Sequence, residues 1–391
     1  MTRFGALVER VDKRVPGSGL PLLSVSQTRG VIRRSELTDT PARAESLDHY
    51  KTCRSGDIVF NKMSVRAGAM GVAHEAGLVT YHYEVMRPRP GTDARYVVYL
   101  MKSEAFTAEM VRRERGIAAG DDSGSVRTTE VPFRVLRTID TFVPSHAQQR
   151  AIADYLDRET AQIDAFIAKN EELVALLNER QHAEFLWVLL ESSSDRKVKL
   201  GRVLQKLDRP APPNSPVVTA FRDGIVTRRE NRRLEGFTET TTDQRSGYQG
   251  IKQGDVVFHG LDGFAGAVGV SESHGQCSPV YHVCRSTSLA DPAYIALLLR
   301  ALGKSGFLEA SAWSVRQRSV DFRNWSTFAR LQVDLPAVAQ QREAVQRLGH
   351  VAEQIRSAKA TALGAIDLAR ERRAALISAA VTGKIDVGVA A

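Results

Sequence analysis

The chain contains two related halves. The run GDIVFNKMSVRAGAMGV, which begins at Gly56, reappears as GDVVFHGLDGFAGAVGV at Gly254, and the same offset of 198 residues continues into GQCSPVYHVCR at Gly275. Further on, the tetrapeptide AQQR occurs at Ala147 and again at Ala339, at an offset of 192. Repeats of about 20–50 residues are typical of solenoids, whereas this much longer period predicts two whole domains of one design. In a chain of 391 residues, each half is long enough to bury its own core.

The composition is that of an ordinary globular protein, with 25% charged and 43% hydrophobic residues, so no long segment need be disordered. No apolar run approaches the roughly 20 residues that cross a bilayer, and residues 1–19 lack a signal-peptide core, so we expect a cytoplasmic protein. The three cysteines, Cys53, Cys277 and Cys284, lack CxxC spacing and predict buried thiols rather than disulfides or a metal site.

Each half is predicted to begin with a mixed domain of strands and helices. Short alternating runs such as DIVF at Asp57 and DVVF at Asp255 are typical of strands. Residues 94–110 and 292–301 are predicted helices. The sequence therefore predicts an α+β fold, in which two similar mixed α/β domains are separated by two long helices.

The long helices are predicted directly beyond Pro144 and Pro336. Residues 146–190 and 338–381 carry heptad seams, one bulky and one rich in alanine, which favours pairing of the two helices with each other. Each is about 60 Å long at 1.5 Å per residue, and the domain that connects them permits either orientation. The residues predicted to pair the helices are Leu156, Ile163, Phe166, Leu173, Leu177, Leu348, Val351, Ile355 and Leu376.

Arginine is clustered at a matching place in each half. The formal charge of +9 and the pI near 9.6 favour a polyanion as partner. The run FRDGIVTRRENRR at Phe221 holds five arginines, QTRGVIRRSE at Gln27 holds three, and each follows a strand-like run. A solvated basic edge would explain one such cluster, whereas its recurrence favours a nucleic-acid-binding surface.

No constellation for catalysis is found in the sequence. It lacks the GxxxxGK[ST] phosphate loop, HExxH, the GxSxG elbow, a nuclease-type carboxylate cluster and the (Asn/Asp)-Pro-Pro-aromatic signature of amino-methyltransferases. The glycines of RAGAMG at Arg66 and GFAGAVG at Gly263 are not followed by a crossover helix, so turns and close strand packing explain them better than a nucleotide site. The pattern indicates a binding protein without catalytic residues.

Several runs match one known family across nearly the whole chain. They are LPLLSV at Leu20, GDIVFNKM at Gly56, GDVVFHGL at Gly254, CSPVYHV at Cys277 and, most specifically, AQQRAIADYLDRETAQID at Ala147 and ERRAALISAAVTGKIDV at Glu371. On these residues the chain resembles the DNA specificity (S) subunit of type I restriction-modification systems. The second helix departs from the family pattern, since it lacks the usual Leu-Asp followed by Thr.

The resemblance implies a non-catalytic, sequence-specific DNA-binding subunit. Two target-recognition domains, residues 1–144 and 193–336, would each read one half of a split DNA target. The two long helices would form an antiparallel coiled coil with approximate two-fold symmetry. The first is in residues 145–192, and the second, with the C-terminal tail, makes up residues 337–391. Expected partners are double-stranded DNA, two methyltransferase (modification) subunits docked on the helices, and restriction subunits. No cofactor is expected in this chain, because S-adenosylmethionine belongs to the methyltransferase partner and ATP and Mg²⁺ to the restriction partner.

The candidates for DNA contact lie in the arginine clusters and near the ends of the repeated strands. Lysine and arginine neutralise phosphates, whereas arginine, asparagine and glutamine also read base edges in the major groove. In the first half the candidates are Gln27, Arg29, Arg33, Arg34, Asn61, Lys62, Arg66 and Arg127. In the second half they are Arg222, Arg228, Arg229, Asn231, Arg232, His259, Arg316, Gln317 and Arg318.

Three alternative functions stay open at this point. A fused enzyme would need a further catalytic domain of about 150 residues, and the two copies leave no unduplicated stretch of that size. A specificity-like subunit of another restriction or phage-exclusion system would keep the same fold. A coiled-coil scaffold without a nucleic-acid role would leave the paired arginine clusters unexplained.

Overall fold

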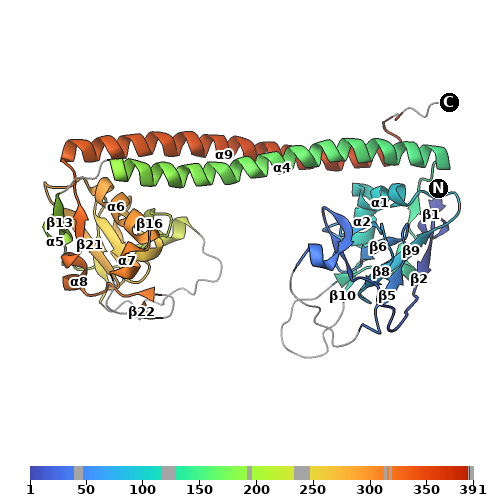
Figure 1. Cartoon of the computed structure of the whole chain (residues 1–391), viewed down its shortest axis with the longest axis horizontal. Coiled ribbons are helices and arrows are strands. Elements are labelled where there is room, and N and C mark those ends of the chain that lie inside the picture. Colours follow the sequence, from blue (N-terminus) through green and yellow to red (C-terminus); the bar gives the residue numbers. More distant parts are fainter. Residues whose placement is uncertain are drawn as a thin grey trace. The chain divides into compact units, whose positions relative to one another are not determined.

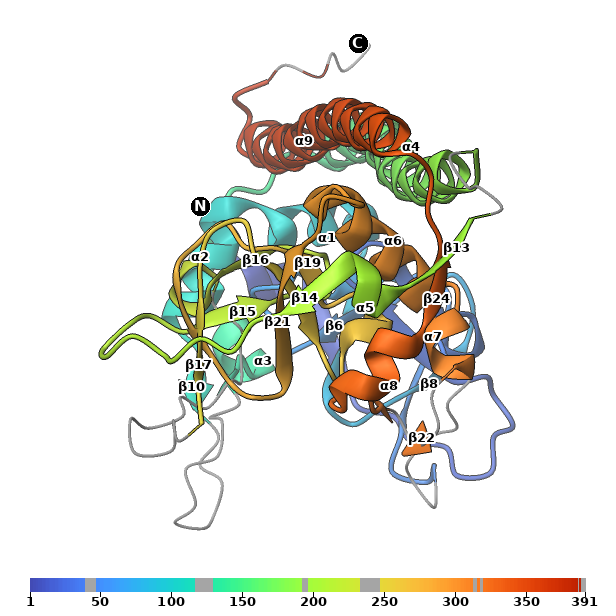
Figure 2. The same cartoon turned by 90° about the vertical axis from the view of Figure 1, so that its left-hand side faces the viewer.

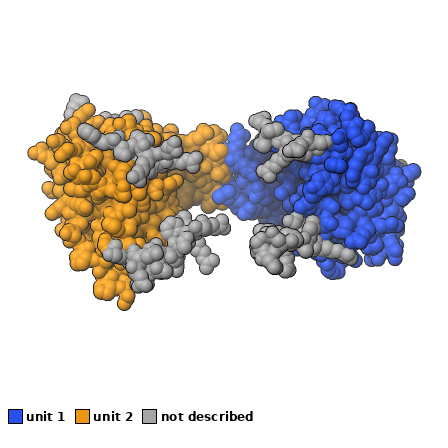
Figure 3. Space-filling model, turned by 90° about the horizontal axis from the view of Figure 1, so that it is seen from below, with its two compact units in different colours: residues 1–172, 362–391 blue, residues 173–361 orange. Residues whose placement is uncertain are grey.

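The chain forms two compact units. The computed structural model describes residues 1–38, 47–116, 129–191, 196–232, 247–311, 315–316, 319–385 and 387. The first unit comprises residues 1–172 and 362–391, and the second comprises residues 173–361 (Figure 3). Each unit combines a mixed α/β domain with one end of each long helix, α4 (His146–Glu191) and α9 (Val338–Val381) (Figure 1). The predicted fold class is confirmed.

A four-stranded antiparallel sheet lies at the centre of each unit, and the strand order is the same in both. It is β2-β9-β6-β7 in the first unit and β14-β21-β18-β19 in the second. Buried valines pair across the middle of each sheet, Val59 opposite Val85 and Val257 opposite Val283. The strands are β2 (Val8–Val11), β6 (Ile58–Asn61), β7 (Met70–Val72), β9 (Tyr83–Pro88), β14 (Leu204–Lys206), β18 (Val256–His259), β19 (Val268–Val270) and β21 (Tyr281–Ser286).

Two-stranded ladders accompany each sheet, and they also correspond between the units. The first unit contains β1 (Thr2–Arg3) with β12 (Asp140–Thr141), β3 (Leu23–Ser26) with β4 (Gly30–Arg33), β5 (Lys51–Cys53) with β8 (Gly77–Val79), and β10 (Arg115–Gly116) with β11 (Thr129–Glu130). The second contains β13 (Lys197–Lys199) with β24 (Gln332–Asp334), β15 (Val218–Ala220) with β16 (Val226–Arg228), β17 (Gln249–Ile251) with β20 (Gly275–Cys277), and β22 (Val315–Arg316) with β23 (Ser319–Val320).

The β3–β4 and β15–β16 hairpins each cross the central sheet over a glycine. A Cβ atom on Gly71 would lie 2.9 Å from the Cα of Gly30, and one on Gly269 would lie 2.0 Å from the carbonyl oxygen of Gly224. Both distances are shorter than any van der Waals contact, so a side chain at either position would push the hairpin off the sheet. Close strand packing therefore accounts for these two repeated glycines, as predicted.

The helix predicted over residues 94–110 is wrong as a single element. It is divided into α1 (Ala94–Lys102) and α2 (Glu104–Arg112), because Ser103 ends the first and its Oγ accepts the N–H of Phe106 as the N-cap of the second. Its counterpart, α6 (Pro292–Lys304), is unbroken. The short helices are η1 (Phe4–Ala6), η2 (Arg34–Glu36), α3 (Phe133–Leu136), α5 (Leu200–Val203), η3 (Arg229–Asn231), η5 (Gly263–Ala265), α7 (Phe307–Ala310) and α8 (Trp325–Arg330).

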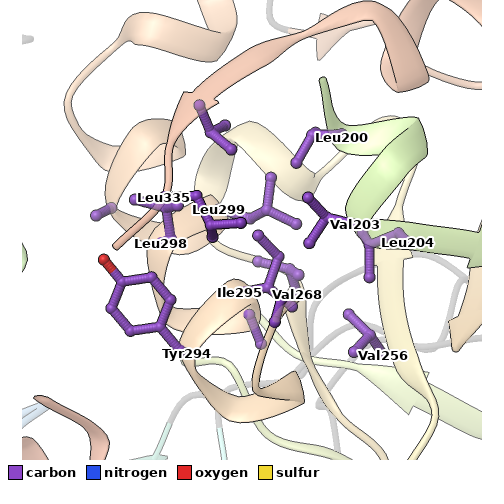
Figure 4. Close-up of a cluster of buried hydrophobic side chains, with 14 of the residues drawn as sticks. Leu200, Val203, Leu204, Val256, Val268, Tyr294, Ile295, Leu298, Leu299 and Leu335 are labelled. Atoms are coloured by element: carbon purple, nitrogen blue, oxygen red, sulfur yellow. The ribbon is translucent and has the colours of Figure 1, made fainter. Parts of the chain in front are cut away.

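Each unit has its own hydrophobic core, which the ends of the long helices complete. In the second unit, Tyr294 and Ile295 of α6 belong to the same cluster as Val256 and Val268 of the sheet (Figure 4). The helix residues in the first core are Ile152, Ala153 and Leu156 of α4 with Ile377, Ala380 and Val381 of α9. Those in the second are Val188 and Leu189 of α4 with Ala344 and Leu348 of α9.

The repeated AQQR motif fixes the start of each long helix to its domain. Gln149 accepts the N–H of Asp93 and donates to the carbonyl of Pro144, both at 3.0 Å, and it is buried. In the second copy, Gln341 makes the same two bonds to Asp291 and Pro336, each at 2.8 Å. The glutamine before each one instead accepts a backbone N–H at the helix start, as in a capping box. The motif therefore has a structural role in both units.

Within each unit α4 and α9 lie side by side and antiparallel (Figures 1 and 2). In the first unit Arg373 binds Asp164 and Arg370 binds Glu171, so the numbering falls along one helix as it rises along the other. In the second unit the corresponding hydrogen bonds are Lys359 to Gln181 and Arg347 to Glu191. The predicted antiparallel pairing is confirmed within each unit. No helix among the described residues is both long and apolar enough to cross a membrane.

The predicted helix seams are partly wrong. Leu156 and Leu348 are buried, but in the cores of the two domains; Ile355 is buried, and Ile163, Leu177, Val351 and Leu376 are half-buried. Phe166 and Leu173, however, are 48% and 44% exposed. The buried positions along α9 include Ile355, Ala362 and Ala369 of the predicted seam, and also Ile366 and Ile377, which lie outside it. The apolar positions of each helix are therefore divided between buried and exposed ones.

Candidate nucleic-acid interface

A pair of consecutive arginines occupies the same structural position in both units. Arg33 is the last residue of β4 and Arg34 the first of η2, while Arg228 ends β16 and Arg229 begins η3. The second arginine of each pair donates its backbone N–H to the strand opposite, at Leu22 or Val217, in both cases at 2.8 Å. In both units, the hairpin that packs over the sheet glycine, Gly71 or Gly269, therefore ends at two consecutive arginines.

The first arginine of each pair points toward solvent. The Arg33 side chain is 54% exposed and donates from Nε and Nη2 to the two carboxylate oxygens of Glu75, both at 2.7 Å. The Arg228 side chain is 37% exposed, and its Nη1 lies 3.6 Å from Glu230. A guanidinium in this position can reach a phosphate or a base edge.

The second arginine of each pair turns toward the domain. Arg34 is half-buried, and its Nε is buried without a hydrogen-bond partner in the described residues. The Nε of Arg229 donates to Thr219 Oγ1 at 3.2 Å. Each lies near an equivalent tyrosine: burial raises the pKa of Tyr83, and raises that of Tyr281 to about 12, while the neighbouring arginine lowers it. Arg34 and Arg229 therefore support the hairpin, and Arg33 and Arg228 are the better candidates for DNA contact.

The other candidates of the first unit lie near this hairpin or at the end of β6. Gln27 is exposed in the β3–β4 turn, where Arg29 pairs with Glu36 at 3.0 Å. Arg66 pairs with Glu114 at 2.9 Å, and Lys62 with Glu130 at 2.7 Å. Asn61 accepts the N–H of Met63 and donates to Ser64, so it holds the turn after β6. Arg127 lies outside the described residues.

In the second unit, the candidates near the β15–β16 hairpin are also paired with carboxylates. Arg222 pairs with Asp262 at 2.9 Å, and Arg232 pairs with Asp223 at 2.7 Å while its guanidinium lies 4.9 Å from the centre of the Phe221 ring. Asn231 is exposed and donates to Thr227. Arg316 lies in β22, where the backbone alone is described, and Gln317 and Arg318 lie outside the described residues.

His259, the counterpart of Asn61, also serves a turn. Its Nδ1 accepts the N–H groups of Leu261 and Asp262, at 3.2 and 2.9 Å, and its ring meets Tyr281 edge-on. Burial lowers the pKa of this imidazole, so it is neutral at pH 7. Because both Asn61 and His259 bind backbone N–H groups of their own turns, they are weaker candidates than the exposed arginines.

A cleft of about 900 Å³ connects the hairpin of the first unit to its long helices. Arg29 and Arg66 line it on the domain side, and Arg370 and Arg373 line it on the helix side. Lys102 also lines the cleft, and burial lowers the pKa of its amine to about 8. In the part of the chain that the structure describes, no group of three or more His, Cys, Asp or Glu side chains could hold a metal ion.

Sequence reasoning did not identify the apolar groove between the long helices. In the first unit it has a volume of about 340 Å³ and is lined by Ile163, Phe166, Leu368 and Ala369, of which Leu368 is 67% exposed. A shift of 192 residues maps Leu368 to Leu176, which is also exposed in the second unit, beside Leu173. The available sequence signal was the seven-residue spacing of Phe166 and Leu173. That spacing predicts a buried seam, whereas both residues are exposed.

The fold is similar to that of solved proteins from type I restriction-modification (R-M) systems. One chain, from work on complex assembly and conformational transition of a type I R-M system, has a TM-score of 0.67 at 16% identity, over 98% of this chain and 97% of that one. The HsdS subunit from Thermoanaerobacter tengcongensis has a TM-score of 0.52 at 16% identity, over 98% of this chain and 96% of that one. This chain has the HsdS fold. The resemblance in motifs and the similarity in fold thus agree, and the HsdS fold spans both units.

No protein-family model matches the chain, and no curated protein matches it in sequence.

Proposed function

We propose that the chain is the DNA-binding specificity subunit of a type I R-M complex, in which each unit reads one half of a split target. The observation that carries the proposal is the exposed arginine, Arg33 or Arg228, at the same place on a repeated hairpin. The HsdS fold and the formal charge of +9 support it. Two similar reading surfaces on one chain fit a target with two separate halves.

The experiment is co-expression with a type I methyltransferase subunit, followed by sequencing of the methylated sites. Exchange of residues 1–144 for the corresponding segment of another HsdS-fold protein should change one half of the methylated sequence and leave the other half intact. A change in both halves would contradict independent reading. The pure chain should transfer no methyl group from S-adenosylmethionine, because we assign that cofactor to the methyltransferase partner and ATP with Mg²⁺ to a restriction partner.

We also propose that two copies of the methyltransferase subunit dock on the long helices, one at the apolar groove that contains Leu368 and one at the exposed Leu173 and Leu176. The exposed Leu368 and Leu176 are related by the internal repeat, so both apolar positions can bind the same surface of one partner. L368D and L176D should each reduce the number of bound methyltransferase subunits from two to one by native mass spectrometry. L363D is the matched control, since Leu363 is about half exposed on α9 outside the groove. Two bound copies in L368D would exclude the groove.

The long helices are proposed to set the spacer between the half-sites, because each of them begins in one unit and ends in the other. Deletion of residues 163–169 together with 355–361 removes one heptad from each helix and shortens the pair by about 10 Å. We expect a target spacer shorter by one to three base pairs, given about 3.4 Å per base pair, with weaker binding. Methylation at the original spacing with full efficiency would contradict this role.

A further inference from the structure

The ion pair between Arg33 and Glu75 joins residues 42 positions apart in a geometry that resembles DNA recognition. Glu75 lies between β7 and β8, and its two carboxylate oxygens accept from Nε and Nη2 of Arg33 at 2.7 Å each. The hydrogen bonds from Arg33 lower the pKa of Glu75, so the carboxylate is charged at neutral pH. One edge of the guanidinium is therefore fully occupied.

This edge is one of the two that a guanidinium can present to nucleic acid. The O6 and N7 atoms of guanine, or two oxygens of one phosphate, accept in parallel from such a fork. A guanidinium edge that binds the carboxylate in this way cannot bind a base or a phosphate at the same time. Glu75 is thus an intramolecular competitor for any DNA contact that uses this edge of Arg33.

The second unit lacks this competitor at the equivalent place. The offset of 198 residues maps Glu75 to Ser273, whose Oγ lies 3.4 Å from Thr227 Oγ1 on β16. Among the described residues, the carboxylate recorded near Arg228 is that of Glu230, at 3.6 Å and through one nitrogen only. The equivalent arginines of the two hairpins therefore differ in their ion pairs: Arg33 has a bidentate pair, and Arg228 has a single, longer contact.

We propose that Glu75 is a specificity-determining residue. It weakens non-specific DNA binding through Arg33, because a ligand must offer two well-placed acceptors to displace the carboxylate from the guanidinium. The inference rests on the proposed DNA-binding function. It implies that the first unit contributes less than the second to binding of random sequence. The effect should be modest, on the order of 2- to 5-fold, since exposed ion pairs are weak.

The test is binding of the full chain to a random-sequence duplex of about 30 base pairs, measured by fluorescence anisotropy over a range of salt concentrations. E75Q should tighten binding about 2- to 5-fold and steepen the log–log salt slope by up to about 0.9, the value for one more neutralised phosphate. S273E should weaken binding, because it introduces the carboxylate into the second unit. E9Q, on exposed Glu9 of β2, removes the same charge elsewhere on the domain.

A double-mutant cycle separates competition from the general effect of charge. If Glu75 acts through Arg33, E75Q should have no effect in the R33A background. An equal gain from E75Q with or without Arg33, or an equal gain from E9Q, would overturn the inference. Weaker binding in R33A without any gain in E75Q would overturn it while leaving the proposed function intact. Unchanged binding in both R33A and R228A would overturn the proposed role of these hairpins as well.

Discussion

Replacement of Gln341 by methionine should destabilise the second unit by about 3 kcal/mol. Gln341 is fully buried and makes three hydrogen bonds: it accepts from Asp291 N at 2.8 Å and donates to the carbonyls of Pro336 and Leu289 at 2.8 and 3.1 Å. Methionine has a similar volume and no amide, so these three backbone groups lose their partner. Each unsatisfied buried group costs about 1–3 kcal/mol, and relaxation makes the sum smaller than three separate losses.

The assay is hydrogen exchange measured by mass spectrometry on the full chain, which reports each unit separately. In Q341M, peptides from α6 and the start of α9 should exchange faster, by up to about 100-fold for 3 kcal/mol. Gln340 provides the matched control: it accepts a single N–H, from Ala337 at 3.2 Å, at an exposed helix start, so Q340M should cost at most about 1 kcal/mol. Equal effects of the two variants, or faster exchange confined to the first unit, would refute the reasoning.

Three further predictions follow from burial. I377A should destabilise the first unit by about 2–4 kcal/mol in the same exchange assay, whereas L368A on the same helix should cost less than about 0.5 kcal/mol, because Leu368 is exposed. Because burial lowers the pKa of Lys102 to about 8, acylation of this amine should reach half its plateau rate near pH 8 by peptide mass spectrometry. Burial raises the pKa of Cys277 to about 12, so native protein at pH 8 should resist iodoacetamide there.

The repeat and the long helices could be predicted because they depend on regular spacing alone. α4 and α9 begin within two residues of Pro144 and Pro336, where proline ends the preceding domain and a heptad pattern follows. The break between α1 and α2 was missed, although Ser103 followed by Glu104 is a local signal for a new helix start. Periodicity also could not tell which apolar positions on a helix are covered, and so it predicts a buried seam at Phe166, which is exposed.

The arginine clusters were located by the sequence, but the direction of each side chain was not. The strand ends at Arg33, and the turn that follows breaks the alternation of faces, so Arg33 points outward and Arg34 inward. Glu75 could not be identified, because the fold alone brings the turn between β7 and β8 next to the end of β4. In the sequence the AQQR motif is a family signature; in the structure its second glutamine binds backbone groups of the preceding domain.

Because residues 362–391 belong to the first unit, that unit cannot be completed until the whole of the second unit has been synthesised. When residue 172 leaves the ribosome, Ile152 and Leu156 still lack their neighbours Ile377 and Val381. The missing segment begins 190 residues later, roughly 10–40 s at ordinary rates of translation. The second unit is one continuous stretch, residues 173–361, and needs no later segment. Folding therefore runs against the order of synthesis: the half made first is finished last, and during that interval its apolar helix face is open to chaperones.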